Sequence, residues 1–220
     1  VHFTTKDFNV NEITEFGAQR VELTGNAFST HEHKPIEPNN TDLINFGCDV
    51  SFVGGYEFDR AQILNELALN GIVVRIWGNN WHKFKNPHKG LVIEFKPAFG
   101  KDYARVVCNS KIMLGFLRKI NRDVETTRTV EIPAFKGFLL AERTVAQQNL
   151  FEEGKEAEYF DDFPELFDKI KFYLNHDERR KIIAHTGFKR CQISGYSYND
   201  QMKKILNLCS VIQNKNKKYS

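Results

Sequence analysis

The chain has 220 residues, 41% of them hydrophobic and 27% charged, which is enough for one large folded domain or for one domain and part of another. Its formal net charge of only +3 gives no general case for a nucleic-acid-binding protein. No apolar run reaches the roughly 18 residues of a membrane span, and the four cysteines are far apart, so we expect a cytoplasmic protein with reduced thiols and no metal site.

The first 40 residues are predicted to form a small β-α-β unit followed by a linker. Strand patterns over residues 1–6 and 20–24 flank a short helix over 11–16. A polar segment with two prolines follows over residues 31–40, and this composition is typical of a linker. Because the chain begins with a strand at Val1 rather than with a methionine, we expect it to be part of a longer protein.

A larger unit is predicted over residues 41–213, in which strands and helices alternate. The expected strands cover residues 49–53, 73–77, 91–95, 111–117 and 137–141, and the expected helices 59–70, 101–109, 126–134, 163–174, 178–189 and 202–212. Asp59 and Asp162 are expected helix caps, and Gly187 an expected helix stop. The alternation predicts the α/β class, with a Rossmann-like parallel sheet, helices on both faces and ligands beyond the carboxyl ends of the strands. Residues 214–220 are predicted to be a disordered basic tail.

Two glycines follow the first strand of the larger unit, at an edge where a ligand would approach. Because Gly54 and Gly55 lack Cβ atoms, they let a phosphate come close to the backbone, and the amides of the following helix can face the anion. The pattern is neither the dinucleotide fingerprint G-x-G-x-x-G nor a P-loop, so a tight strand-to-helix turn explains it equally well. Arg60, at the start of that helix, is either a phosphate ligand or a solvated surface arginine.

An acidic residue, Glu131, lies just before Pro133 in the segment EIPAFKG. Proline disfavours helical geometry in the residue before it, so we expect Glu131 at a helix start or in a loop near the edge of the sheet. There its carboxylate could accept both hydroxyls of a ribose, or it could simply complement a helix dipole. Asp123, Lys111 and Arg128 would supply the remaining charges of a nucleotide-sugar site, although such residues also occur on solvated faces.

Aromatic and acidic side chains elsewhere are open to two interpretations. Trp77 and Tyr103 could stack on a base or could pack in the core. Magnesium sites usually combine one or two carboxylates with substrate phosphates, so we interpret the acidic run over residues 152–158 as an exposed loop.

Six motifs occur in order over residues 49–206, namely DVSFVGGYEFDR, VVRIWGNNW, NSKIMLGFL, NRDVETTRTVEIPAFKGFLLAERT, LFEEGKEAEYF and GYSYNDQMKKIL. In these motifs the sequence resembles the CgeB-type spore-maturation glycosyltransferase-like proteins, which are similar to GT-B glycosyltransferases. The resemblance implies two Rossmann-like domains that face a cleft. Residues 41–213 would then be the C-terminal, nucleotide-sugar-binding domain, and residues 1–40 a remnant of the N-terminal domain with the linker.

The resemblance also implies a reaction and roles for site residues. The expected reaction is transfer of a hexose-type sugar from a nucleotide-diphosphate donor to an unknown acceptor, with no metal and no further cofactor. Glu131 would contact the ribose, and Asp123, where the family usually has Glu, would orient the sugar. Arg60 and Lys111 would offset the charge of the leaving diphosphate. The expected nucleotide-binding set is completed by Gly54, Gly55, Arg128 and Tyr103. The alternatives are a non-catalytic spore-coat or surface-assembly protein that keeps the fold, and a module for another nucleotide.

Overall fold

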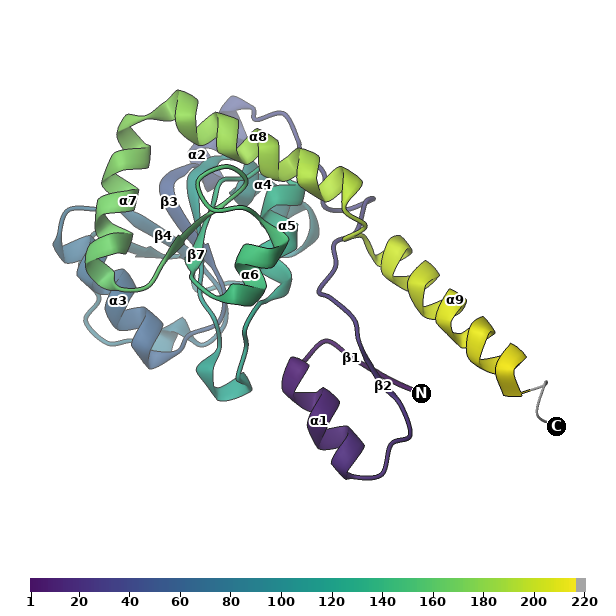
Figure 1. Ribbon diagram of the computed structural model, residues 1–220. Helices are drawn as coiled ribbons and strands as arrows, with labels where there is room; N and C mark the ends of the chain where they lie inside the picture. The colour runs from purple at the N-terminus through teal and green to yellow at the C-terminus, as the bar shows by residue number, and fades with distance from the viewer. Residues whose placement is uncertain (217–220) are drawn as a thin grey trace.

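Six strands lie side by side in one parallel sheet in the computed structural model, which describes residues 1–216 (Figure 1). They are β3 (Cys48–Val53), β4 (Val74–Trp77), β5 (Leu91–Ile93), β6 (Ser110–Gly115), β7 (Leu139–Glu142) and β8 (Glu158–Phe160). Their order is β5-β4-β3-β6-β7-β8, and every neighbouring pair is parallel. The chain therefore runs outward from β3 to one edge, returns to β6, and runs outward to the other edge, as in a doubly wound fold. The predicted α/β class is confirmed.

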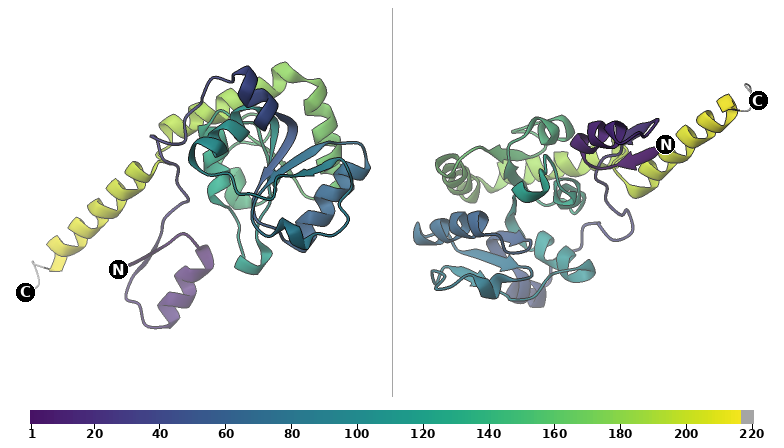
Figure 2. Two further views of the ribbon diagram at one scale, coloured as in Figure 1. Left: turned by 180° about the vertical axis from the view of Figure 1, so that it is seen from behind. Right: turned by 90° about the horizontal axis from the view of Figure 1, so that it is seen from below.

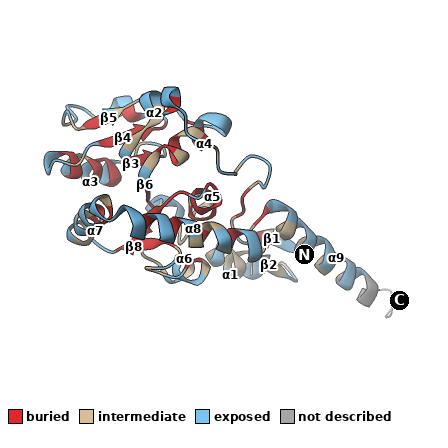
Figure 3. Ribbon diagram, turned by 90° about the horizontal axis from the view of Figure 1, so that it is seen from above, coloured by how far each residue is buried: buried red, intermediate tan, exposed pale blue. Residues whose placement is uncertain are grey.

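Helices cover both faces of this sheet because successive strand residues point to opposite sides. Phe52 and Leu114 belong to one core cluster, whereas their neighbours Val53 and Met113 belong to the other. On the first face lie α3 (Phe58–Leu69) and α7 (Phe163–Asn175), and on the second α4 (Gly100–Cys108) and α5 (Thr127–Ala134). The other elements of this part are α2 (Asn40–Phe46), η1 (Trp81–Lys83), η2 (Lys119–Asn121), α6 (Val145–Leu150), α8 (Asp177–Ile193) and α9 (Tyr198–Asn216). Buried residues concentrate on the sheet and on the helix faces turned toward it (Figure 3).

The N-terminal unit forms a separate two-stranded parallel sheet (Figure 2). It consists of β1 (His2–Thr4), α1 (Asp7–Glu15) and β2 (Val21–Leu23), and α1 contains no buried residue. The chain then passes through Phe28, which is buried and bonded on both sides to the junction between α8 and α9. The Phe28 amide donates to Tyr196 O at 3.1 Å, and the Tyr198 amide donates to Phe28 O at 2.9 Å. These two bonds fix the linker against the larger unit.

The first helix is α1 at residues 7–15 rather than 11–16, and two of the predicted helix-boundary residues have other roles. The N-cap of α3 is Glu57 rather than Asp59, which lies in the first turn. Gly187 does not stop α8 but lies buried within it. A Cβ atom at this position would lie 2.3 Å from the carbonyl oxygen of Glu156, so glycine is needed for close packing and not for ending the helix. By contrast, Asp162 caps α7 as expected, since its side chain accepts from the Glu165 amide.

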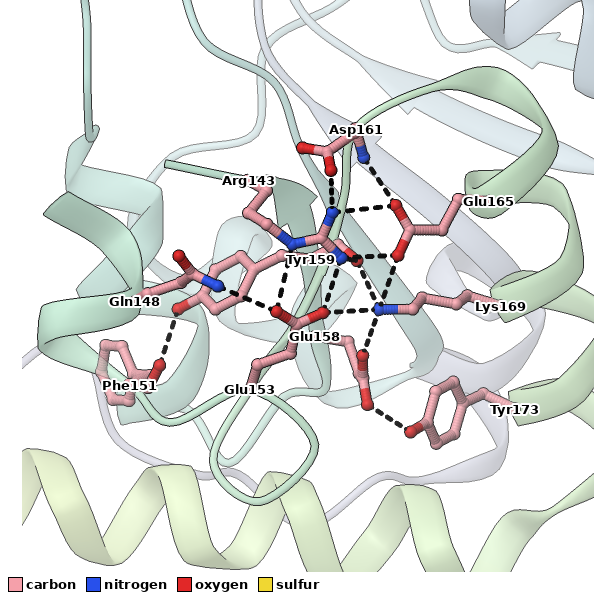
Figure 4. Close-up of polar contacts among 10 residues, drawn as sticks. All are labelled: Arg143, Gln148, Phe151, Glu153, Glu158, Tyr159, Asp161, Glu165, Lys169 and Tyr173. Carbon is pink, nitrogen blue, oxygen red and sulfur yellow. Dashed lines mark hydrogen bonds and ion pairs between the residues drawn. The ribbon is translucent and has the colours of Figure 1, made fainter. Parts of the chain in front are cut away.

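The acidic run over residues 152–158 is only partly an exposed loop. Its last residue, Glu158, begins the edge strand β8 and is buried. Lys169 donates to its carboxylate at 2.7 Å and Tyr173 at 2.5 Å (Figure 4). The expectation of an exposed loop is therefore wrong at this position, because the Lys169 cation and the Tyr173 hydroxyl of α7 stabilise the buried carboxylate.

At the C-terminal end, α9 continues to Asn216 and so enters the segment 214–220 for which the sequence predicts a disordered tail. Residues 217–220 of that prediction lie outside the described residues. None of the helices within residues 1–216 combines the length and the hydropathy that crossing a bilayer requires.

Candidate functional site

A crevice opens where the strand order reverses, beyond the carboxyl ends of β3 and β6. A pocket of about 340 Å³ lies there, between the first turn of α3 and the segment that follows β6. Its charged lining residues are Glu57, Asp59, Arg60, Arg118, Lys119 and Glu142. In a doubly wound sheet this is the position at which ligands bind, so we place the candidate site here.

Arg60 is a buried cation in this pocket and not a solvated surface residue. Its Nη2 donates to Leu117 O at 3.1 Å and to a Glu57 carboxylate oxygen at 3.0 Å, and its Nη1 donates to Gly55 O at 3.3 Å. Its Nε has no hydrogen-bond partner among the described residues. Burial lowers the pKa of Arg60, and the carboxylates of Glu57 and Glu142 oppose that shift. The site thus holds a fixed cation with one donor still to be satisfied.

The two glycines after β3 have different structural roles. A Cβ atom on Gly54 would lie 2.4 Å from the Phe52 ring, and one on Gly78 would lie 1.9 Å from Gly54 O. Gly54 is therefore required by the tight turn itself. Gly55, in contrast, has only one atom within 4 Å of its missing Cβ, Asn79 O at 3.9 Å. The space above Gly55 is open to a ligand.

A second, smaller pocket of about 120 Å³ lies at the same edge of the sheet, at the ends of β3 and β4. Gly54, Gly55 and Gly78 line one part of it, and Phe99 and Arg128 contribute to the remainder. Phe99 is largely exposed and precedes α4. The structure thus brings the predicted residues Gly54, Gly55 and Arg128 to one place.

Glu131 lies within α5 and not at a helix start or in a loop, so that expectation is wrong. Pro133 is accommodated because it lies in the last turn of a helix that ends at Ala134, where only one helical hydrogen bond is lost. The Glu131 side chain is buried, and one carboxylate oxygen accepts from Arg128 Nη1. The other, Oε1, lies 3.9 Å from Nε2 of His33, a residue of the linker.

Asp123 and Lys111 each form an ion pair with a residue other than Glu131. The Asp123 side chain is largely buried and pairs with Lys6 of the N-terminal unit, so it holds that unit against the larger one. Lys111 lies at the amino end of β6 and forms an ion pair with Asp49 at 2.8 Å. Because β3 and β6 are parallel, the amino ends of both strands lie on the side of the sheet opposite to the crevice. The expected role of Lys111 in offsetting diphosphate charge is therefore wrong.

The aromatic candidates belong to the core. Tyr103 and Trp77 are both buried, and the Tyr103 ring packs edge-on against Phe135 with a centroid distance of 5.3 Å. The guanidinium carbon of Arg128 lies over the Tyr103 ring, 4.1 Å from its centroid. Burial raises the pKa of the Tyr103 hydroxyl. Tyr103 is thus not available to stack on a base, and its expected role in binding the nucleotide is wrong.

Two residues of this region were not among the sequence-based candidates. Glu142 ends β7, lines the larger pocket, and accepts from the Leu117 amide at 2.5 Å. Burial raises its pKa. Glu142 directly follows the strand expected over residues 137–141, and this position at a carboxyl end could have identified it as a candidate site residue. His33 gave no such signal, since it comes from the linker and reaches Glu131 only through the tertiary fold.

A larger pocket, of about 710 Å³, lies at the amino edge of the sheet and includes Cys48, Lys111 and Lys136. It is at the end of the strands opposite to the crevice, so it does not form part of the candidate site. Among the described residues, no group of three or more His, Cys, Asp or Glu side chains is arranged to hold a metal ion.

A family model described as glycosyl transferase-like matches residues 60–207, which is more than half of the chain. A search among curated protein sequences found no match.

Several solved structures share the fold. The crystal structure of Alr3699/HepE from Anabaena with UDP and glucose has a TM-score of 0.71 at 11% identity, covering 95% of this chain and 62% of that one. Sucrose-phosphate synthase from Thermosynechococcus elongatus has a TM-score of 0.70 at 11% identity, covering 97% and 58%. The C-terminal domain of a glycosyl transferase group 1 family protein, LpcC from Francisella tularensis, has a TM-score of 0.60 at 11% identity, covering 78% and 99%. The chain thus spans about three fifths of the first two proteins and nearly the whole of the third, single-domain structure.

Proposed function

Because the chain belongs to the glycosyl transferase-like family, we propose that it forms the donor-binding half of a GT-B glycosyltransferase. The proposed reaction moves a hexose-type sugar from a nucleotide-diphosphate donor to an acceptor, without a bound metal ion. The order of the motifs over residues 49–206 supports a CgeB-type member of the family. The match to an isolated C-terminal domain supports the assignment of residues 41–213 to donor binding and of residues 1–40 to a preceding domain.

One observation carries the proposal: the buried cation Arg60 of the crevice donates to Gly55 O at 3.3 Å, and the open backbone of Gly55 lines the neighbouring pocket at the same end of the strands. The N-cap of α3, Glu57, accepts no amide with its side chain, so the first amides of α3 have no side-chain cap. Helix amides and a fixed guanidinium together favour a phosphate. Arg60 would then offset the negative charge that develops on the leaving diphosphate.

The proposed ribose ligand is Glu131. Arg128 occupies one of its carboxylate oxygens, whereas the other oxygen, Oε1, accepts no hydrogen bond among the described residues. A carboxylate accepts hydrogen bonds from both hydroxyls of a diol, and charged acceptors form the stronger bonds. The HepE structures contain UDP with glucose, or UDP-glucose, which supports a nucleoside diphosphate as the ligand class.

The test is a calorimetric titration of the wild-type chain with UDP, GDP and ADP in the presence of EDTA. We expect one of the three to bind. We expect Arg60→Gln to weaken that binding about ten- to hundredfold, because a hydrogen bond to a charged group contributes roughly 1.5–3 kcal/mol. Lys111→Gln is the matched control, since Lys111 lies at the opposite edge of the sheet, and it should bind like the wild type.

A folded wild-type chain that binds none of the three would contradict the proposal and would favour a non-catalytic protein with the same fold. Equal affinities of the Arg60 and Lys111 variants would show that the diphosphate does not bind beside Arg60 in the crevice. Thermal unfolding of both variants checks that the loss of the buried Arg60 contacts has not unfolded the chain.

A further inference from the structure

His33 lies in a polar turn of the linker and inserts its ring between α4 and α5. The ring packs edge-on against Phe135, with centroids 5.2 Å apart, and against Tyr103 at 6.4 Å. Only 13% of its side chain is exposed. A polar ring is rarely held among aromatic side chains without a partner for its nitrogens, so its two nitrogen atoms are informative.

Each ring nitrogen of His33 has a distinct neighbour. The backbone amide of Ser29 donates to Nδ1 at 3.0 Å. A nitrogen that accepts a hydrogen bond carries no proton, so the neutral ring carries its proton on Nε2. Nε2 faces Glu131 Oε1 at 3.9 Å. The turn at Ser29 therefore selects the tautomer whose N–H points at the carboxylate.

The two oxygens of the Glu131 carboxylate are thus flanked by different parts of the chain. Arg128, one turn earlier in α5, bonds to Oε2, and the linker residue His33 faces Oε1. The Arg128 hydrogen bond fixes Oε2, and the His33 ring, whose Nε2 lies 3.9 Å from Oε1 and beyond hydrogen-bonding distance, limits the rotation of the carboxylate on its other side. We propose that His33 is a positioning residue for the nucleotide site, holding Glu131 in the orientation that accepts the ribose hydroxyls. This inference rests on the proposed function, in which Glu131 is the ribose ligand.

Hydrogen bonds just before the turn and within it hold this part of the linker in place. Phe28 is buried and bonded to the junction between α8 and α9. Within the turn, the His33 amide donates to Ser29 O at 2.8 Å, and the Glu32 amide donates to Ser29 Oγ at 3.2 Å. The position of the linker is thereby coupled to the orientation of Glu131.

The charges around His33 set the expected pH dependence. Burial lowers its pKa below the ordinary value of 6.5, and the carboxylates of Glu131 and Glu32 oppose this shift, whereas Arg128 adds to it. The fourth titratable neighbour is Tyr103. His33 is therefore neutral at pH 7. A second proton would have to bind at Nδ1, which could then no longer accept the hydrogen bond from the Ser29 amide. Protonation at low pH should therefore free the ring from the turn and weaken nucleotide binding.

The experiment compares two amide replacements of His33 by calorimetric titration with UDP. In His33→Gln the side-chain amide nitrogen reaches the position of Nε2, whereas in His33→Asn the side-chain oxygen can replace Nδ1 but nothing reaches Glu131. We expect the Gln variant to bind UDP like the wild type and the Asn variant to bind about three- to tenfold more weakly. In a Glu131→Gln background the Asn replacement should cause no further loss. Between pH 7.5 and pH 5.5, affinity should fall more for the wild type than for His33→Gln.

The outcomes separate this inference from the proposed function. If His33→Asn binds UDP as tightly as the wild type, the positioning role is overturned while the proposed function stands. If the wild-type chain binds no nucleoside diphosphate, the proposed function fails and the positioning role fails with it. An NMR titration of the His33 ring then reports on the contact alone, because removing the carboxylate in Glu131→Gln should lower the pKa of His33.

Discussion

Each charged residue predicted from the sequence for the site forms an ion pair within the fold, and the position of each pair shows whether the residue lies near the crevice. The ion pairs are Arg60 with Glu57, Arg128 with Glu131, Asp123 with Lys6, and Lys111 with Asp49. The pair of Lys111 with Asp49 lies at the amino ends of the strands, opposite the crevice, and the pair of Asp123 with Lys6 joins the N-terminal unit to the larger one. The pairs of Arg60 and Glu131 lie at the carboxyl edge, and there a ligand would share or replace one partner.

A single glycine in α8 provides a test at the residue scale. Gly187→Ala should destabilise the protein by about 1–3 kcal/mol, because the added Cβ would lie 2.3 Å from a backbone oxygen of the neighbouring loop, which cannot move as a side chain can. Gly25→Ala is the control, since its Cβ would meet one atom at 3.9 Å. Urea unfolding measures both. Equal midpoints for the two variants would show that the loop and α8 are not held in close contact.

At the scale of elements, an ion-pair network joins three segments that are separate in the sequence (Figure 4). Arg143, after β7, binds Glu153 of the acidic loop at 2.7 Å and Glu165 of α7 at 2.5 Å. Lys169 of α7 binds the same Glu153 at 2.8 Å and the buried Glu158 of β8 at 2.7 Å. The network thus fixes the loop and the edge strand β8 onto α7. The sequence showed the acids, but the cations that bind them come from other elements.

This network predicts a stability that depends on pH. Hydrogen bonds from Arg143 lower the pKa values of Glu153 and Glu165 from 4.5 to about 2. A depressed carboxylate pKa stabilises the fold above the unfolded value, and that contribution is lost as pH falls toward the folded value. Glu153→Gln should therefore be less stable than the wild type at pH 7, and the difference should shrink between about pH 5 and pH 3.

Denaturant unfolding at several pH values measures this difference. The neighbouring acid offers a matched control, because Glu152 is well exposed and, within residues 1–216, forms an ion pair with the exposed Lys155 alone. Surface pairs of this kind contribute little, so Glu152→Gln should change stability little at any pH. A difference between wild type and Glu153→Gln that does not change with pH would contradict the assignment.

At the scale of the whole molecule, the two sheets differ in how much core supports them. The six-stranded sheet carries a core cluster on each face, whereas the N-terminal sheet has two strands and a helix without buried residues. Two-stranded sheets are marginally stable without further packing. Ion pairs such as Lys6 with Asp123 hold the N-terminal unit in place, but they bury little apolar surface.

Hydrogen exchange should therefore separate the two sheets. We expect the amides of β1 and β2 to exchange much faster than those of β3 and β6, because local opening of the N-terminal unit exposes few buried contacts. Mass spectrometry of peptides from both sheets measures the rates. Equal protection in the two sheets would show that the N-terminal unit unfolds only together with the larger one.

The alternation of strands and helices was sufficient to predict the α/β class. Helices that connect successive parallel strands pack on the two faces of the sheet that the strands form. The same pattern predicted that ligands bind beyond the carboxyl ends of the strands, which is where the candidates Gly55 and Arg60 lie. The edge strand β8 was not predicted. It is short and follows an acidic run, and its buried Glu158 is stabilised by Lys169 of α7, a contact that the local sequence does not show.

Only the tertiary structure decided which charged residues meet. Lys111 lies near the candidate residues in the sequence. It is nevertheless at the amino end of β6, and the length of the strand separates it from the crevice at the carboxyl end. His33 is distant in the sequence yet faces Glu131, because the linker folds back over α4 and α5. Local sequence encodes the direction and periodicity of each element, whereas contacts between side chains of different elements arise only when the elements pack.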